Sequence, residues 1–377
     1  MFSPKKPSIR LTWMSKRASK TPPNSHSKAS IQAATEHPNT PTPNSRTPTS
    51  PQRSTNMSNQ SYISTIIQSY HESLNDYDDT FIIGEDIQHA LMGTTRDLVD
   101  EFGEERVWDA PISEQGFHGL AIGAAMDGKR PIIEYQINTM AYMAMDQLVN
   151  NAQKLRHMTY GQVSIPLTIT VPQAGTPGGS AAQHSDNPYP SLLNLGIKTV
   201  VPSTPYDQLG LFRSAVAEDD PVMVFWPAPV IGNRAEVPDE HYTIPLGEAD
   251  IKREGEDVTV VAIGETVPDV LSVAETLAPE VSIEVVDPRT LLPLDEETIL
   301  ESVEKTGRAV VVDATNRTCG TAGEIASRIS DKAFWYLDAP VKRVTRADVP
   351  VSYSPPEEQF VIPDEETITE AIRDVAP

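Results

Sequence analysis

Short apolar runs rich in Val and Ile alternate with longer amphipathic segments from residue 61 onward. Apolar runs of strand length, separated by segments of helical period, indicate a parallel sheet covered by helices on both faces. In the first half we predict strands at 80–86, 106–111, 130–136, 165–172, 198–204 and 221–227. We predict helices at 61–74, 94–103, 119–128, 141–158 and 206–219.

The alternation stops at a polar connector and then resumes. The connector shows neither the period of a helix nor that of a strand. Beyond it we predict strands at 258–264, 281–291, 309–315 and 341–346, again separated by helices. The fold class is therefore α/β, in two domains with mainly parallel sheets covered by helices. We expect a first domain over residues 57–230, a linker over 231–250 and a smaller second domain over 251–377.

Residues 1–56 differ from the rest in composition. They carry nine Lys and Arg against one acid, Glu36, within Ser-, Thr- and Pro-rich tracts. Such a segment cannot bury enough apolar surface to offset the entropy of ordering it. We interpret it as a disordered tail or as upstream sequence from a misassigned start, with Met57 the better start. A transit-like peptide, which is also basic and acid-poor, is the alternative.

Charge and cysteine content narrow the function classes. The chain has 53 acidic and 30 basic residues, a net charge of −23, which argues against nucleic acid or an anionic membrane as partner. Its single cysteine, Cys319, excludes an internal disulfide and a cysteine-based zinc site. No apolar run is long enough to cross a bilayer. We expect a cytoplasmic protein, and the acid-rich, Lys-poor body favours a halophilic host.

One carboxylate has an unusual setting. In PISEQGF, residues 111–117, Glu114 lies between a strand and a helix rich in Gly and Ala, with no Lys or Arg within several residues. We expect it to be largely buried; from these residues alone, a cap of the next helix is the favoured role, because a carboxylate near a helix N-terminus is stabilising. The common nucleotide and metal motifs are absent: there is no G-x-G-x-x-G after a strand, no Walker loop and no H-E-x-x-H.

Several longer stretches carry a specific resemblance. They are FIIGED, GTTRDLVDEFGEERVWDAPISEQGF, AAQHSDNPY and VDPRTLLPLDEETILESVEKTG. From about residue 60 to the C-terminus the chain resembles the β subunit of thiamine diphosphate-dependent 2-oxo acid dehydrogenases. That family includes the pyruvate, branched-chain 2-oxo acid and acetoin dehydrogenase complexes. The resemblance implies a transketolase-like pyrimidine domain followed by a transketolase C-terminal domain.

The resemblance also implies roles for individual residues. Glu114 would bond the N1′ nitrogen of the aminopyrimidine and activate the cofactor, and His184 in AAQHS would face the reacting carbon or guide the acyl group. Ile112, Gln136 and Met140 would contact the cofactor. Met140 stands where the family usually has an aromatic residue. Backbone carbonyls would bind K⁺ at Leu167, Ala215, Val216, Glu218 and Asp220. Histidines 71, 89, 118, 157 and 241 match no role.

A missing element implies a partner. Thiamine diphosphate enzymes carry a GDG…N element that holds Mg²⁺ and the diphosphate, and this chain has none. The resemblance therefore implies a separate α subunit, an α2β2 tetramer, and a lipoylated acyltransferase that receives the acyl group from the 2-oxo acid or acetoin. The alternative is a non-catalytic relative that keeps the fold for assembly or regulation. The sequence does not specify the oxo acid.

Overall fold

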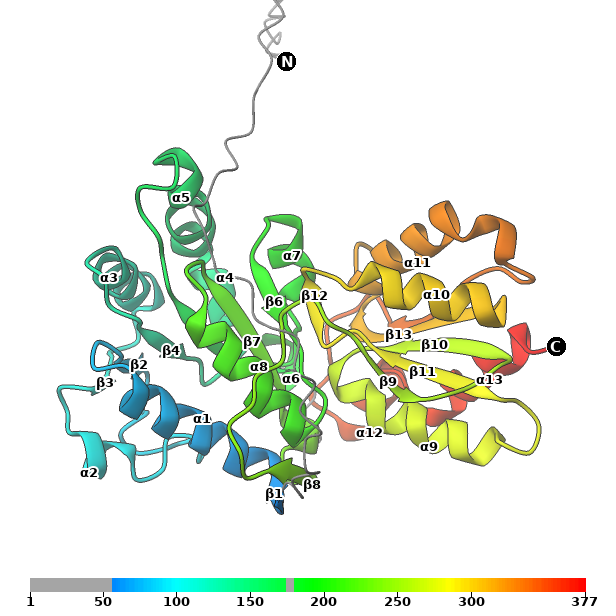
Figure 1. The fold of residues 1–377 in the computed structure, drawn as a ribbon, viewed down its shortest axis with the longest axis horizontal. Coiled ribbons are helices and arrows are strands. Elements are labelled where there is room, and N and C mark those ends of the chain that lie inside the picture. Colours follow the sequence, from blue (N-terminus) through cyan, green and yellow to red (C-terminus); the bar gives the residue numbers. More distant parts are fainter. Residues whose placement is uncertain (1–55, 174–179) are drawn as a thin grey trace, which may run out of the picture. The chain divides into compact units, whose positions relative to one another are not determined.

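The computed structural model describes residues 56–173 and 180–377, and residues 54–377 form one compact unit. Within that unit, two sheets are each covered by helices (Figure 1). The predicted α/β class with mainly parallel sheets is confirmed. Residues 1–55 lie outside the described ranges, so the expectations for residues 1–56 stay predictions.

The first sheet has seven strands in the order β12-β6-β7-β5-β4-β2-β3. All neighbours are parallel except β12, which runs antiparallel to β6. The strands are β2 (Ile82–Gly84), β3 (Val107–Asp109), β4 (Ile132–Glu134), β5 (Thr168–Gln173), β6 (Lys198–Val200), β7 (Val222–Pro227) and β12 (Thr290–Leu292). Strands β2, β4, β5 and β7 are buried at every position, as expected for strands covered on both faces.

Helices cover both faces of this sheet. On one face lie α1 (Tyr62–Asp76) and α8 (Pro205–Ala217), where the rings of Tyr70 and Phe212 meet edge-on at 5.6 Å. The other face carries α3 (Glu114–Met126), α4 (Met140–Met143), α5 (Lys154–Met158) and α7 (Tyr189–Asn194). Two short helices complete this half, α2 (Leu98–Phe102) and α6 (Ala181–His184).

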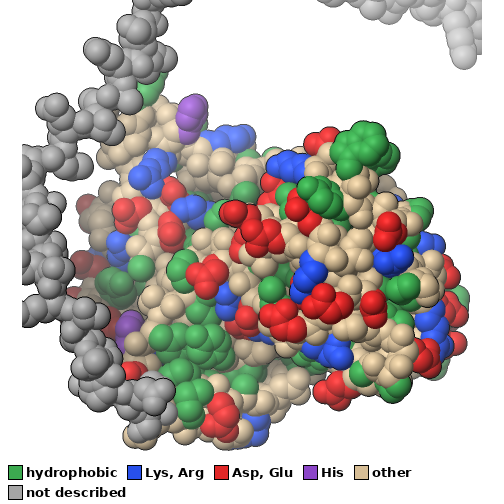
Figure 2. Space-filling model, turned by 45° about the vertical axis from the view of Figure 1, so that its right-hand side comes forward, with side chains coloured by type: hydrophobic (Ala, Val, Ile, Leu, Met, Phe, Trp, Pro, Cys, Tyr) green, Lys and Arg blue, Asp and Glu red, His purple; other side chains and the backbone are tan. Residues whose placement is uncertain are grey.

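The second sheet has the order β14-β13-β10-β11-β9, with only β9 antiparallel to its neighbour. Its strands are β9 (Asp250–Arg253), β10 (Val258–Ala262), β11 (Ile283–Asp287), β13 (Ala309–Asn316) and β14 (Lys342–Arg346). Its helices are α9 (Val267–Leu277), α10 (Glu296–Thr306), α11 (Thr321–Lys332), α12 (Pro355–Val361) and α13 (Glu365–Val375). On the face seen in Figure 2, acidic and basic side chains are interspersed.

The single helix predicted at 141–158 is wrong. The structure has α4, then a π-helical segment at Gln147–Gln153, then α5. The side chains of Asn150 and Asn151 both bond to Asp146, at its carboxylate (2.7 Å) and its carbonyl (3.3 Å). Asn side chains that bond nearby backbone compete with regular helical bonding, which accounts for the altered winding. Similarly, α2 is shorter than predicted, because Asp97 before it adopts a positive φ of 64°.

The single strand predicted at 281–291 is also wrong, because it divides between the two sheets. β11 ends at Asp287, and after Pro288 the backbone turns at Arg289, which has a φ of +53°. β12 then pairs with β6 in the first sheet. Periodicity reports only that a strand is buried, so it could not show that this apolar run serves two sheets.

The predicted connector contains a strand. β8 (Arg234–Pro238) pairs antiparallel with β1 (Met57–Ser61), which precedes α1. Met57 therefore begins a short strand, and the helix predicted at 61–74 follows it as α1. Ser61 caps α1 through its side chain, which accepts from the Ser64 amide at 3.3 Å.

A buried charge network joins the two sheets. Lys252 Nζ lies 2.6 Å from Asp207 Oδ2 on α8, 2.7 Å from Asp250 Oδ2 and 3.7 Å from Asp287 Oδ2. Arg289 Nη1 reaches Asp207 Oδ1 at 3.2 Å. Asp207 and Asp287 are fully buried, so each depends on these cations to compensate its desolvation.

Replacing Lys252 by Met should lower the free energy of unfolding by about 3–5 kcal/mol, because two buried carboxylates lose a cation. Urea denaturation at pH 7 measures this loss. The control is Lys129→Met, whose ammonium is 47% exposed and 3.9 Å from Asp79. It should cost less than about 1 kcal/mol. Equal losses in the two variants would contradict the assigned role of the network.

Candidate active site

Polar side chains gather at the carboxyl edge of the first sheet. β2 and β4 are paired in register and end at Gly84 and Glu134. Glu85 directly follows β2, Gln136 follows β4 by two residues, and Ala110 after β3 donates its amide to the Gly84 carbonyl at 2.7 Å. Ligands of open parallel sheets bind outside the carboxyl ends of the strands. This edge is therefore where a ligand site is expected.

Glu114 is the first residue of α3, so its carboxylate lies at the positive end of a helix. In this chain it is half-buried, and the expectation that it is largely buried is wrong for the chain by itself. Ile112 and Ser113, directly before it, are exposed. Among the described residues, no Lys or Arg forms an ion pair with Glu114.

Two neighbours respond to the Glu114 carboxylate. Burial raises the pKa of Glu85, and the charge of Glu114 raises it further. Tyr135 is fully buried, and burial followed by the charge of Glu114 raises the pKa of its hydroxyl well above the usual value. The charge of Glu114 therefore disfavours ionisation of both Glu85 and Tyr135.

His118, one turn after Glu114, is tied to the same group. Its Nδ1 lies 2.7 Å from the carbonyl of Glu114, and its Nε2 lies 2.7 Å from the Tyr135 hydroxyl. A carbonyl only accepts, so Nδ1 is the donor and Nε2 accepts from Tyr135. Burial lowers the pKa of His118 to about 4, which keeps the ring neutral at neutral pH.

Glu134 is a second unusual carboxyl group. It is fully buried at the end of β4, and its Oε1 accepts a 2.5 Å bond from the Thr94 hydroxyl. Burial raises the pKa of Glu134 to about 7, and the hydrogen bond from Thr94 only partly opposes the shift. The carboxyl is therefore partly protonated at neutral pH.

Several buried polar atoms at this edge have no hydrogen-bond partner in the chain. They are Glu85 Oε1, Glu134 Oε2, Asn138 Oδ1 and both amide atoms of Gln136. Buried polar groups in folded proteins are almost always paired, so these atoms are available to water or to a ligand. They include both donors and acceptors, which suits a heterocycle that both donates and accepts, as an aminopyrimidine does.

The candidate histidine is joined to this edge through a neighbouring helix. His184 ends α6 and is exposed. The Thr139 hydroxyl, at the start of α4, donates to the Gln183 carbonyl at 2.6 Å. α6 therefore lies against the helix that begins with Met140. The glycine-rich residues before α6, 174–179, lie outside the described residues.

Known families match both halves of the chain. Residues 59–231 match the family described as "Transketolase, pyrimidine binding domain", and residues 247–368 match "Transketolase, C-terminal domain". The β subunit of acetoin:2,6-dichlorophenolindophenol oxidoreductase from Bacillus subtilis (strain 168) is 43% identical over 74% of this chain and 82% of its own length. From the same organism, the β subunits of 2-oxoisovalerate dehydrogenase and pyruvate dehydrogenase E1 are 37% and 38% identical, each over 85% of this chain and 99% of their own length.

The chain belongs to the β-subunit family of thiamine diphosphate-dependent 2-oxo acid and acetoin dehydrogenases. A solved structure described as "Split gene transketolase, inactive beta4 tetramer" matches 84% of the present chain and 98% of its own chain, with a TM-score of 0.68. At 20% identity, that likeness concerns the fold alone.

The three predicted cofactor contacts of this β subunit differ in how far they are exposed. Ile112 is 84% exposed, so it can contact a ligand or a partner subunit directly. Met140 is only 4% exposed and belongs to the same core as Phe117 and Ala121. Gln136 is half-buried and carries two of the orphaned atoms. Their cofactor contacts stay predictions.

The predicted K⁺ carbonyls lie near basic side chains of the β subunit. Arg130 Nη1 donates to the carbonyls of Val216 and Glu218 at 2.9 Å each. The Leu167 carbonyl accepts from the Val222 amide at 2.9 Å. K⁺ at these atoms would share two carbonyls with a guanidinium, so the K⁺ site, which also includes Ala215 and Asp220, stays a prediction.

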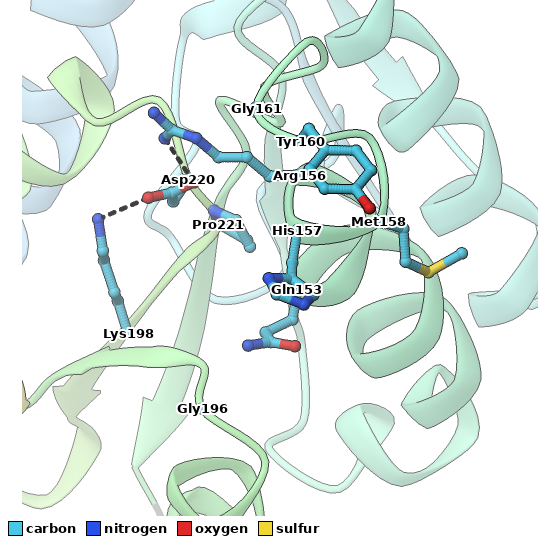
Figure 3. Close-up of a pocket in the computed structure, with 10 residues that line it drawn as sticks. All are labelled: Gln153, Arg156, His157, Met158, Tyr160, Gly161, Gly196, Lys198, Asp220 and Pro221. Atoms are coloured by element: carbon cyan, nitrogen blue, oxygen red, sulfur yellow. Dashed lines mark hydrogen bonds and ion pairs between the residues drawn. The ribbon is translucent and has the colours of Figure 1, made fainter. Parts of the chain in front are cut away.

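A cavity of about 590 Å³ lies at the opposite edge of the first sheet (Figure 3). Lys198 begins β6 and Pro221 precedes β7, so this is the amino edge. Its charges are paired internally: Arg156 and Lys198 contact Asp220 at 2.7 Å and 3.1 Å. Neither Glu114 nor His184 lines it, so it is not the candidate active site.

Several residues at the site were not predicted from the sequence. Glu134 had a usable signal, since it is an acid inside the apolar strand RPIIEYQ. His118 had none, because its partner Tyr135 lies on another element. Among residues 56–173 and 180–377, no group of three or more His, Cys, Asp or Glu could hold a metal ion. In the same residues no helix is long and apolar enough to span a membrane.

The buried Glu134 should make stability depend on pH. Its pKa of about 7 in the folded chain exceeds the ordinary value near 4.5, so the folded state holds a proton that the unfolded state has released. The associated stability is fully present below pH 4.5 and is lost as pH rises through 7, with a slope of up to about 1.4 kcal/mol per pH unit.

The measurement is the free energy of unfolding at several pH values for the wild type and Glu134→Gln. The amide keeps the acceptor for Thr94 but does not titrate, so its stability should fall less between pH 5 and pH 8. Glu104→Gln, an exposed site, is the control and should follow the wild type. Parallel curves for wild type and Glu134→Gln would show that this carboxyl does not titrate in that range.

Proposed function

We propose that this chain is the β subunit of an enzyme that uses thiamine diphosphate to cleave a 2-oxo acid or acetoin. The acyl group would pass to the lipoyl group of an acyltransferase partner. The observation that carries the proposal is Glu114 at a helix N-terminus, where its charge acts on Glu85 and Tyr135 near the carboxyl edge of the first sheet. Family membership supports the same reaction class.

Glu114 would hold the pyrimidine half of the cofactor. Its carboxyl group would share a proton with a ring nitrogen, while Gln136 and Asn138 offer donors and acceptors to the rest of the ring. When bound, thiamine diphosphate supplies a carbon nucleophile that adds to a carbonyl. Burying Glu114 against the ligand and a partner subunit would disfavour its charged form and thus favour holding that proton. His184 would contact the substrate or the acyl group.

A second subunit would complete the site. The outward face of α3 exposes Leu120 and Met126, and a side chain at Gly119 or Gly123 would meet nothing within 4 Å. Ile112 adds an exposed apolar side chain beside Glu114. An apolar face this close to a half-buried catalytic group supports an α subunit that covers it, supplies the Mg²⁺ and diphosphate half, and forms an α2β2 tetramer.

The cytoplasm is the compartment we propose. Cys319 is exposed and free, as expected for a thiol in a reducing compartment. No feature of the described site selects between a 2-oxo acid and acetoin, because the partner subunit would line part of the substrate pocket.

Calorimetric titration of thiamine diphosphate and Mg²⁺ tests the cofactor site, using the chain alone and co-purified with its α partner. We expect binding only in the complex, and at least about tenfold weaker binding for Glu114→Gln, since a charge-assisted hydrogen bond is lost. Glu104→Gln is the matched control and should bind like the wild type. Equal binding by Glu114→Gln would remove Glu114 from the cofactor site.

The substrate class is tested with the same complex. Acetoin, pyruvate and branched-chain 2-oxo acids are offered with free lipoamide or an artificial electron acceptor, and product formation is followed. We expect turnover of at least one of them and at least a hundredfold loss in Glu114→Gln. Cofactor binding without turnover of any of these substrates would favour the non-catalytic assembly or regulatory relative.

A further inference from the structure

The residues that follow His184 are held by the second domain. Arg346, at the end of β14, is 4% exposed. Its Nη1 donates to the Ser185 carbonyl at 2.9 Å, and its Nη2 contacts Asp186 Oδ1 at 2.6 Å. The same guanidinium is oriented by Asn316, which accepts from its Nε at 2.8 Å. A buried guanidinium that bonds one backbone carbonyl and one carboxylate fixes both groups in direction as well as distance.

Glu265 holds the same segment at a second point. It lies in a short 3₁₀ segment after β10, and its Oε1 accepts from the Asn187 side chain at 3.3 Å. Its backbone amide donates to Gln173 Oε1 at 3.3 Å. Gln173 ends β5, so Glu265 contacts the chain both before and after the residues that carry His184.

A glycine permits this close approach. Gly264 has a φ of +55°, and a Cβ there would lie 2.5 Å from Val201 Cγ1 and 2.7 Å from Gln173 Oε1. Both the left-handed conformation and the lack of space require glycine. The backbone of the second domain can therefore approach the first sheet closely at this point.

The opposite side of the segment contacts the candidate active site. Tyr142 of α4 donates its hydroxyl to Asp186 Oδ2 at 3.3 Å, and Thr139 bonds the Gln183 carbonyl. Asp186 thus bridges Tyr142 and Arg346. The segment from Gln183 to Asn187 is clamped between the helix of Met140 on one side and the second domain on the other.

A cavity of about 300 Å³ lies behind the clamp, lined by Ser185, Asn187, Glu265 and Arg346 among others. The charged groups facing Glu265 are Asp313, Asp269 and Arg346. Burial raises the pKa of Glu265 to about 8, so at neutral pH its carboxyl is mostly neutral. A neutral carboxyl acts here as a hydrogen-bond acceptor for Asn187, a role that a glutamine can reproduce.

We propose that Glu265 and Arg346 are positioning residues, which let the second domain fix the segment Ser185–Asn187 and thereby the place of His184 at the active site. Neither residue touches the reacting atoms. The structural part of the proposal stands on the contacts above. Its consequence for catalysis rests on the proposed function.

Hydrogen exchange of the full-length chain, followed by mass spectrometry, tests the structural part without any activity. In Arg346→Ala, the amides of Ser185, Asp186 and Asn187 should exchange about tenfold faster or more than in the wild type, because the segment loses its anchor. The matched control is Arg343→Ala, on the same strand, whose guanidinium donates to the Arg317 carbonyl at 3.3 Å and forms no ion pair with the described residues. Its exchange over 185–187 should equal that of the wild type.

Three further variants, at Asp186 and Glu265, test the same contacts with smaller changes, so that the test does not depend on correct folding of Arg346→Ala. Asp186→Asn removes the ion pair from the other side while Arg346 stays in place, and should raise exchange of the same amides by a smaller factor. Glu265→Gln should leave exchange unchanged, whereas Glu265→Ala should raise it. If Arg346→Ala and Arg343→Ala exchange alike over 185–187, or if Glu265→Gln and Glu265→Ala do, the positioning proposal is wrong.

Kinetics of the complex with the α subunit test the consequence. Arg346→Ala and Glu265→Ala should lower kcat at least about tenfold while thiamine diphosphate affinity stays within twofold, because Glu114 is not disturbed. Glu265→Gln should restore kcat. Faster exchange together with unchanged kcat would separate the clamp from catalysis and overturn the role of His184 placement. A wild-type complex without turnover would overturn the proposed function and leave the clamp intact.

Discussion

The close pairing of β2 with β4 at the carboxyl edge of the first sheet is the constraint on which the site depends. A Cβ at Gly84 would lie 2.4 Å from the Glu134 carbonyl, so only glycine permits the strands to end side by side. Because they do, Glu85 and Gln136 emerge at one edge and α3 begins directly beside them, with Glu114 in its first turn. A bulkier residue at position 84 would separate the two strands and disperse the acids.

Burial then determines the chemistry of that edge. The strands are covered on both faces, so Glu134 at the end of β4 is fully buried and its charge is poorly solvated. Glu134 therefore has a pKa of about 7, and Glu85 is also shifted upward. An acid that titrates near neutral pH can hold or release a proton there at little cost. Glu114 differs because it is only half-buried in this chain; under the proposed function, a ligand and a partner subunit would cover it.

Local pattern predicted much of this, and long-range contact explains the rest. The runs around β10 and β13, the Glu114 turn and the two-domain α/β class follow from apolar period and turn residues. β12 was not separable from β11, because burial looks the same in either sheet. The clamp of Arg346 on Ser185 joins elements far apart in the chain, and nothing near either residue signals the other. His118 gave no signal for the same reason, since Tyr135 completes its bonding.

Met140 illustrates how burial changes the weight of a departure from the family pattern. Read from sequence alone, a thioether in place of an aromatic ring suggests a weakened cofactor site. In the folded chain Met140 is 4% exposed and packs in the core with Phe117 and Ala121. A flexible side chain can fill such a space while neighbouring residues adjust. Its identity is therefore constrained by packing within this chain, so the departure is weak support for a non-catalytic protein. The orphaned atoms of Gln136 and Glu134, which packing leaves without partners, bear more directly on function.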